Sequence, residues 1–94
     1  RADYRSIAKA VEALMFNLLP ARLSNYRATI KTNGARREAE KRVALFERFV
    51  REVPTDERLH QELRKAKQAL GSIRATQAAV SIQRDDIDRR SSWW

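Results

Sequence analysis

Cysteine is absent from this sequence of 94 residues, which excludes a disulfide framework and any thiolate metal site. Only two glycines and two prolines are present, too few for the many turns of an all-β fold. Apolar runs are short, so we expect no membrane-spanning segment. The single histidine, His60, stands beside Asp56 and Glu57, and we interpret it as a surface residue rather than a metal ligand.

The residues needed for catalysis are also scarce. No glycine-rich phosphate loop and no nucleophile–base pair can be recognised. Asp56 and Glu57 stand where a helix would begin, and the acidic cluster at residues 85–88 has arginine partners four residues later. We therefore predict a protein that is not an enzyme, with no catalytic residues, no cofactor and no metal.

A heptad pattern dominates the C-terminal half of the chain. Steps of four and three residues keep side chains on one side of a helix, because their mean of 3.5 nearly equals the helical repeat. The pattern predicts one long helix packed lengthwise on another helix. Its seam positions are Leu59, Leu63, Ala66, Leu70, Ile73, Gln77, Val80, Arg84 and Ile87.

The rest of the chain predicts further helices. We expect an all-α fold, an elongated helical bundle or hairpin of three main helices in a single domain over residues 1–94. The expected helices are residues 3–31, bent at Pro20, then 35–53 and 55–90, followed by a tail at 91–94. Asp3 and Thr55 are the expected N-caps, and Lys-Thr-Asn-Gly at 31–34 is the expected loop. The expected core comprises Leu14, Leu18, Val43, Phe46, Val50, Leu63, Leu70 and Ile73.

A glycine lies inside the long helix beside the seam residue Leu70, and two seam positions are polar. Gly71 is interpreted as a glycine tolerated where another backbone comes close, and a helix break there is the alternative. Gln77 and Arg84 place polar groups at seam positions, which fixes register or oligomeric state in coiled coils. Alternatively, the seam ends near Ser81 and a partner covers the remaining turns.

Positive charge is the strongest indication of function. Twenty basic residues against twelve acidic ones give a formal net charge of +8, and fifteen of the basic residues are arginine. Residues 13–37 and 63–84 contain no acid, and such surfaces attract phosphate backbones. Asn25, Thr29, Thr32 and Asn33 are possible additional donors. The predicted nucleic-acid-binding residues are Arg22, Arg27, Lys31, Arg36, Arg37, Arg64, Lys67 and Arg74.

Other subunits are the second expected class of partner. We expect the long helix to extend beyond the second helix, so that Val80 and Ile87 contact another chain. The adjacent Trp93 and Trp94 are interpreted as an anchor in a neighbouring subunit, or else as an idle end.

Together these features predict a structural subunit of a nucleoprotein assembly, such as a virion, a nucleocapsid or a ribosome-like particle. It would bind the backbone of DNA or RNA. The alternative is a coiled-coil module for homo- or hetero-oligomerisation with no nucleic-acid role. A membrane-peripheral role ranks last, and we favour a location inside a cell or particle over secretion.

Overall fold

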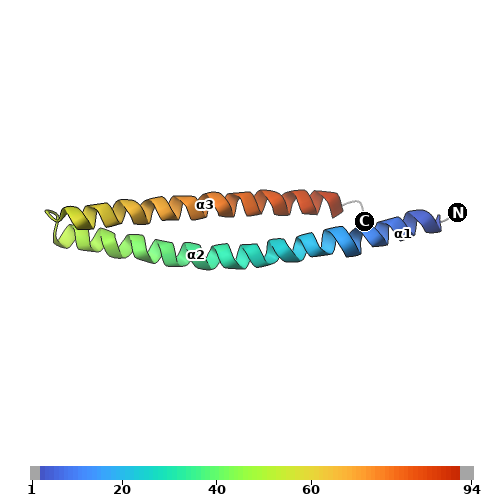
Figure 1. Ribbon diagram of the computed structural model, residues 1–94, viewed down its shortest axis with the longest axis horizontal. Coiled ribbons are helices and arrows are strands. Elements are labelled where there is room, and N and C mark those ends of the chain that lie inside the picture. The colour runs from blue at the N-terminus through green and yellow to red at the C-terminus, as the bar shows by residue number, and fades with distance from the viewer. Residues whose placement is uncertain (1–2, 92–94) are drawn as a thin grey trace.

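Two long antiparallel helices form a rod of 77 × 15 × 13 Å (Figure 1). The computed structural model describes residues 3–91, which form the helices α1 (Tyr4–Ala13), α2 (Leu19–Glu52) and α3 (Glu57–Ser91) and the π-helical turn η1 (Leu14–Leu18). The first three elements follow one another without a loop, and α3 folds back along α2. The all-α class and the long C-terminal helix are confirmed, but the prediction of three main helices is wrong, since the rod has two.

The expected loop at residues 31–34 does not exist, because α2 runs through it. Neither Asn33 nor Gly34 adopts a positive φ angle. The Asn33 side chain accepts a hydrogen bond of 2.7 Å from Gln77 of α3, so it does not form the local turn that was expected. Glycine in a helix costs only about 1 kcal/mol. Packing along α3 on both sides of this site therefore outweighs the local preference for a turn.

The expected interruption at Pro20 is a single widened turn. The Leu19 N–H donates to the Leu14 carbonyl, five residues earlier. A proline ring crowds the carbonyl four residues before it, and a π-turn is one way to accommodate that crowding. Pro20 then lies in the first turn of α2, where its missing N–H costs little. This turn therefore contains one more residue than an ordinary α-helical turn, and the helix continues through it without a loop.

The turn between α2 and α3 is short and well capped. Asp56, rather than the expected Thr55, caps α3: its Oδ1 accepts from the N–H groups of Arg58 at 2.9 Å and Leu59 at 3.4 Å. His60 Nε2 lies 2.8 Å from the Pro54 carbonyl and donates to it. At the other end of the chain, Asp3 accepts from Arg5 N–H at 3.0 Å, as expected for the cap of α1.

Gly71 is an ordinary interior residue of α3. The helix continues through it, so the alternative of a break is wrong. A methyl group placed on Gly71 would meet no atom within 4 Å. The expected close approach of another backbone is therefore also wrong.

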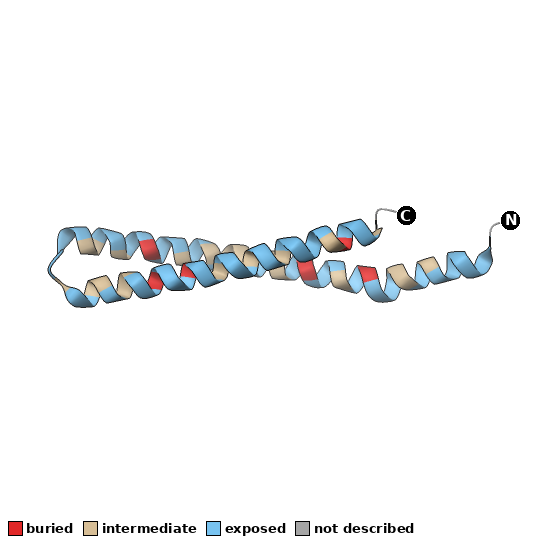
Figure 2. Ribbon diagram, turned by 90° about the horizontal axis from the view of Figure 1, so that it is seen from above, coloured by how far each residue is buried: buried red, intermediate tan, exposed pale blue. Residues whose placement is uncertain are grey.

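The interior of the rod is thin. One cluster contains Val43, Ala66 and Leu70, and Leu18 and Ile87 are buried nearer the other end (Figure 2). Three residues of the expected core are buried, and the other five are partly buried: Leu14, Phe46, Val50, Leu63 and Ile73. Ala66 and Ile87 are buried as well, although they were not in the expected core. Two helices in contact enclose only the innermost positions of each seam.

The expected overhang of the long helix is wrong. Because α2 is not broken at residue 34, it accompanies α3 along its length, and α1 is the segment that extends past the end of α3 (Figure 1). Ile87 is only 5% exposed within the single chain, and Val80 is partly buried. The reason for placing these two residues at an interface with another chain is thereby removed. Trp93 and Trp94 lie outside the described residues.

Candidate nucleic-acid interface

Polar side chains fix the register where the long seam loses its apolar residues. Asn25, which is 4% exposed, donates through Nδ2 to the Val80 carbonyl at 2.9 Å and to Gln83 Oε1 at 3.0 Å. Gln77 donates to Asn33 Oδ1 and accepts from Arg36 at 3.4 Å. A shift of either helix would break these bonds. The polar seam position at Gln77 therefore specifies how α3 aligns on α2 within the chain.

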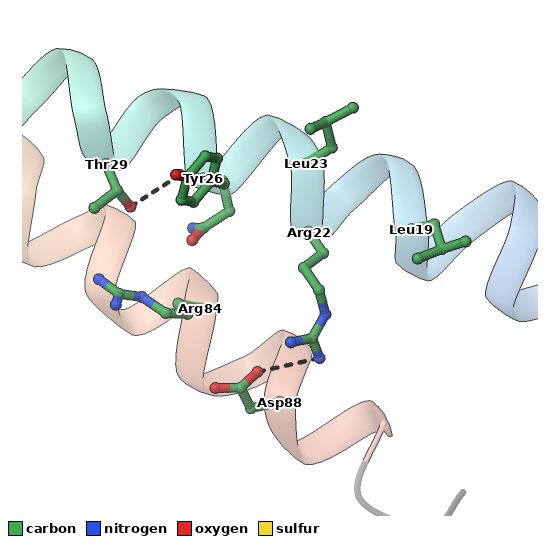
Figure 3. Close-up of a pocket in the computed structure, with 8 residues that line it drawn as sticks. Leu19, Arg22, Leu23, Tyr26, Thr29, Arg84 and Asp88 are labelled. Carbon is green, nitrogen blue, oxygen red and sulfur yellow. Dashed lines mark hydrogen bonds and ion pairs between the residues drawn. The ribbon is translucent and has the colours of Figure 1, made fainter.

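Two of the eight predicted nucleic-acid-binding residues hold the hairpin together instead. Arg22 pairs with Asp88 at 3.2 Å and donates to Ser91 Oγ at 2.8 Å (Figure 3). Arg36 contacts Gln77, and its buried Nε lies 3.6 Å from Glu40, an electrostatic contact too long for a hydrogen bond. These two guanidinium groups are already engaged, so they are poor candidates for phosphate binding.

A polar groove between the helices has a basic lining. Arg74 and Arg84 line it from α3, and no acidic residue belongs to its lining. Both arginines are exposed, and neither forms an ion pair within residues 3–91. We call this surface the arginine groove; its other lining residues are Thr29, Thr32, Asn33, Gln77, Ala78, Val80 and Ser81.

The donors in the arginine groove are fewer than the sequence suggested. Thr29 donates to the Asn25 carbonyl at 2.9 Å, and Thr32 donates to the Ala28 carbonyl at 2.8 Å. Their hydroxyl protons are thus used inside α2, and Asn25 is buried against α3. The two guanidinium groups are the cationic groups in the groove's lining. Ten residues separate them along α3, which is roughly 15 Å at about 1.5 Å per residue.

The other predicted basic residues do not converge on this groove. Lys31 lines a separate and more apolar recess with Ile73 and Thr76. Arg37 is exposed and donates to the Asn33 carbonyl at 3.4 Å. The remaining three are exposed at other positions along the rod: Arg27, Arg64 and Lys67. The structure thus places one of the eight predicted residues, Arg74, in the arginine groove.

Arg84 is the residue that sequence reasoning missed. It was recognised as a polar seam position inside an acid-free stretch, yet it was not included among the binding residues. Its position follows from the register: Arg84 lines both the arginine groove with Thr29 and a neighbouring recess with Asn25 and Tyr26, and it is exposed to solvent. A basic residue at a seam position was the available indication.

Two acidic residues near the C-terminal end of α3 are engaged in ion pairs. Asp86 pairs with Arg90 at 3.0 Å and with Arg89 at 4.0 Å, while Asp88 pairs with Arg22.

Among residues 3–91 no three side chains of histidine, aspartate or glutamate gather as a metal site would require. None of the helices in this part of the chain is apolar enough over a sufficient length to cross a bilayer. Comparison of the chain with protein families, curated proteins and solved structures finds no significant match.

Proposed function

We propose that this hairpin is a non-enzymatic structural subunit of a nucleoprotein assembly and that it contacts nucleic-acid backbone through the arginine groove. The observation that carries the proposal is a pair of exposed arginines, Arg74 and Arg84, which form no ion pair within residues 3–91 and lie in a groove whose lining contains no acid. Guanidinium groups bind phosphate oxygens in a forked geometry, and each contact releases counterions. The net charge of +8 adds long-range attraction.

The shape of the protein supports backbone contact rather than base reading. A rod of 77 Å matches about two turns of a duplex, at roughly 34–36 Å per turn, or a stretch of extended single strand. Arg64 and Lys67 continue the basic character of α3 beyond the groove and are exposed. Phosphate contacts of this kind position a protein without selecting a sequence.

The test is a binding titration of the full chain with a labelled single-stranded RNA and a labelled DNA duplex at several salt concentrations. The double variant Arg74→Gln/Arg84→Gln should lower the magnitude of the slope of log K against log salt by roughly 1.4 to 1.8, because each lost phosphate contact contributes about 0.7 to 0.9. The matched control is Arg51→Gln/Arg58→Gln, which removes the same charge from exposed positions near the turn.

Different outcomes separate the explanations. If the control variant loses less nucleic-acid affinity and less salt dependence than the groove variant, the arginine groove is supported as the binding surface. Equal losses would mean that only net charge matters, and the groove would have no special role. Absence of binding by the unmodified chain at low salt would overturn the proposal.

Exposed apolar side chains favour a second candidate function, a protein–protein module with no nucleic-acid role. Tyr4, Phe16 and Tyr26 are 86%, 74% and 63% exposed. Large aromatic groups left in solvent are typical of surfaces that a partner covers. Sedimentation of the chain alone, and with candidate partners, tests this function separately from nucleic-acid binding.

A further inference from the structure

A line of apolar side chains runs along the outside of α1, η1 and the first half of α2. Steps of three and four residues place its members on one side of each helix. The π-turn joins the two halves, because the Leu19 N–H bonds to the Leu14 carbonyl and Leu19 therefore follows Leu14 on the same side. We call this line the apolar stripe; it comprises Tyr4, Ile7, Val11, Leu14, Leu19, Leu23, Tyr26 and Ile30.

The apolar stripe is exposed over most of its length. Seven of its eight side chains are between 45% and 86% exposed, and Leu14 is partly buried. It spans residues 4–30, roughly 40 Å of helix at about 1.5 Å per residue. Single exposed apolar residues are normal on a protein surface, but a continuous line of this length marks an interaction site.

The stripe also has the shape that a helix would fit. Leu19, Leu23 and Tyr26 line a recess between α2 and α3 with a volume of about 570 Å³ (Figure 3). In this view Leu23 points away from α3, on the side of α2 that α3 does not cover. A third helix laid along the stripe would place its apolar side chains here, as helices of a bundle do.

Charges around the stripe specify what kind of helix fits. Arg84 stands across the recess on α3, and Arg27 follows Tyr26 on the outer side of α2; both are exposed and without an ion pair within residues 3–91. Asp88, the acid in the recess, is already paired with Arg22 at 3.2 Å. Residues 13–37, beside the α2 part of the stripe, contain no acid, whereas the α1 part has Asp3 and Glu12 as well as Arg5 and Lys9. A second copy of this chain would bring the same basic border against it, and like charges facing each other oppose association.

We propose that the apolar stripe binds an amphipathic α-helix of a partner protein whose apolar side chains follow three- and four-residue spacing and whose flanks carry glutamate or aspartate. The apolar face covers the stripe, and the acidic flanks contact Arg27 and Arg84. This inference rests on the protein–protein role described above and does not depend on nucleic-acid binding. The assembled form is a three-helix bundle over the first half of α2.

The experiment uses the full chain and two synthetic helical peptides of roughly 28 residues, matched to the stripe at about 1.5 Å per residue. Both peptides carry leucine at three- and four-residue spacing; one has glutamate on its flanks and the other has lysine. We expect the glutamate peptide to bind at least tenfold more tightly in fluorescence anisotropy, with the difference shrinking at high salt.

Substitutions in the chain locate the binding surface. Leu23→Asn should weaken binding of the glutamate peptide roughly tenfold or more, because it places an amide in the middle of the buried face. The matched control is Ile82→Asn on α3, an apolar residue that is 67% exposed and outside the stripe. It should leave the affinity unchanged. Circular dichroism and thermal unfolding check that both variants keep the hairpin.

Several results would overturn the inference. Equal binding of the two peptides would show that the partner need not be acidic, while leaving the protein–protein role in place; failure of both peptides would remove that role as well. An unchanged affinity in Leu23→Asn would show that the stripe is not the surface. Self-association of the chain that Leu23→Asn abolishes would assign the stripe to a second copy. Binding to phosphatidylserine vesicles in place of the peptides would assign it to a membrane surface.

Discussion

Replacing Leu70 with alanine tests whether the thin interior between α2 and α3 is what holds the hairpin. Leu70 is 7% exposed and packs with Val43 and Ala66. The substitution removes three carbon atoms, and at about 0.8 kcal/mol each their lost burial amounts to roughly 2.4 kcal/mol. Only two helices surround the site, so they can close on the space, and we expect little of the additional cavity cost seen in larger cores.

The assay is urea unfolding followed by circular dichroism, together with thermal unfolding. For a domain of this size the expected loss corresponds to a fall in Tm of about 10–20 °C. Leu45→Ala is the matched control: the same three carbons are removed from a side chain that is 46% exposed, so the expected loss is about 1 kcal/mol. If the two variants were equally destabilised, burial in the single chain would not be the determining factor, and the reasoning would fail.

Three further predictions follow from the polar contacts and the glycines. Asn25→Ala should destabilise the hairpin by about 1–2 kcal/mol in urea unfolding, because two donated hydrogen bonds are lost at a buried position; no change would show that they do not hold the register. Asp56→Ala should cost about 1 kcal/mol by the same measurement as the cap of α3 is removed, whereas Thr55→Ala should be nearly neutral. Gly34→Ala and Gly71→Ala should each raise stability by up to about 1 kcal/mol, since an added methyl meets no atom within 4 Å; a lower Tm in either would contradict this account.

The seam of α3 shows how much a heptad pattern can predict. Leu63, Ala66, Leu70 and Ile73 were expected on one side of one long helix, and all four are buried or partly buried there. Apolar residues at three- and four-residue spacing line one side of a helix, and packing that side on another helix shields them from water. The short turn at Pro54 was equally predictable, because proline and a following cap restrict the backbone locally.

Asn33-Gly34 shows where local reasoning fails. The pair favours a turn in isolation, and the difference from a helix is only about 1 kcal/mol. In the structure Asn33 accepts from Gln77 across the interface, a partner 44 residues away in the sequence. Contacts at that separation cannot be inferred from a single sequence without knowing the register.

The candidate site depends on the same register. Arginine excess and acid-free stretches favoured an anion-binding surface. They could not distinguish Arg22, which is paired with Asp88, from Arg84, which lines the arginine groove and forms no ion pair within residues 3–91. Likewise, the sequence has three- and four-residue spacing of apolar residues from Tyr4 to Leu14 and again, with an offset, from Leu19 to Ile30. Only the π-turn, with its bond from Leu19 to Leu14, joins them into one exposed stripe.

The sequence by itself determined the helical class, the long C-terminal helix and the turn near Pro54, because periodicity, proline and capping act over a few residues. The tertiary structure alone decided that α2 continues through Gly34, which arginines are already paired, and which apolar face remains open to solvent. Those outcomes depend on the alignment of two helices. Hydrogen bonds such as Asn25 to Val80 fix that alignment between residues far apart in the chain.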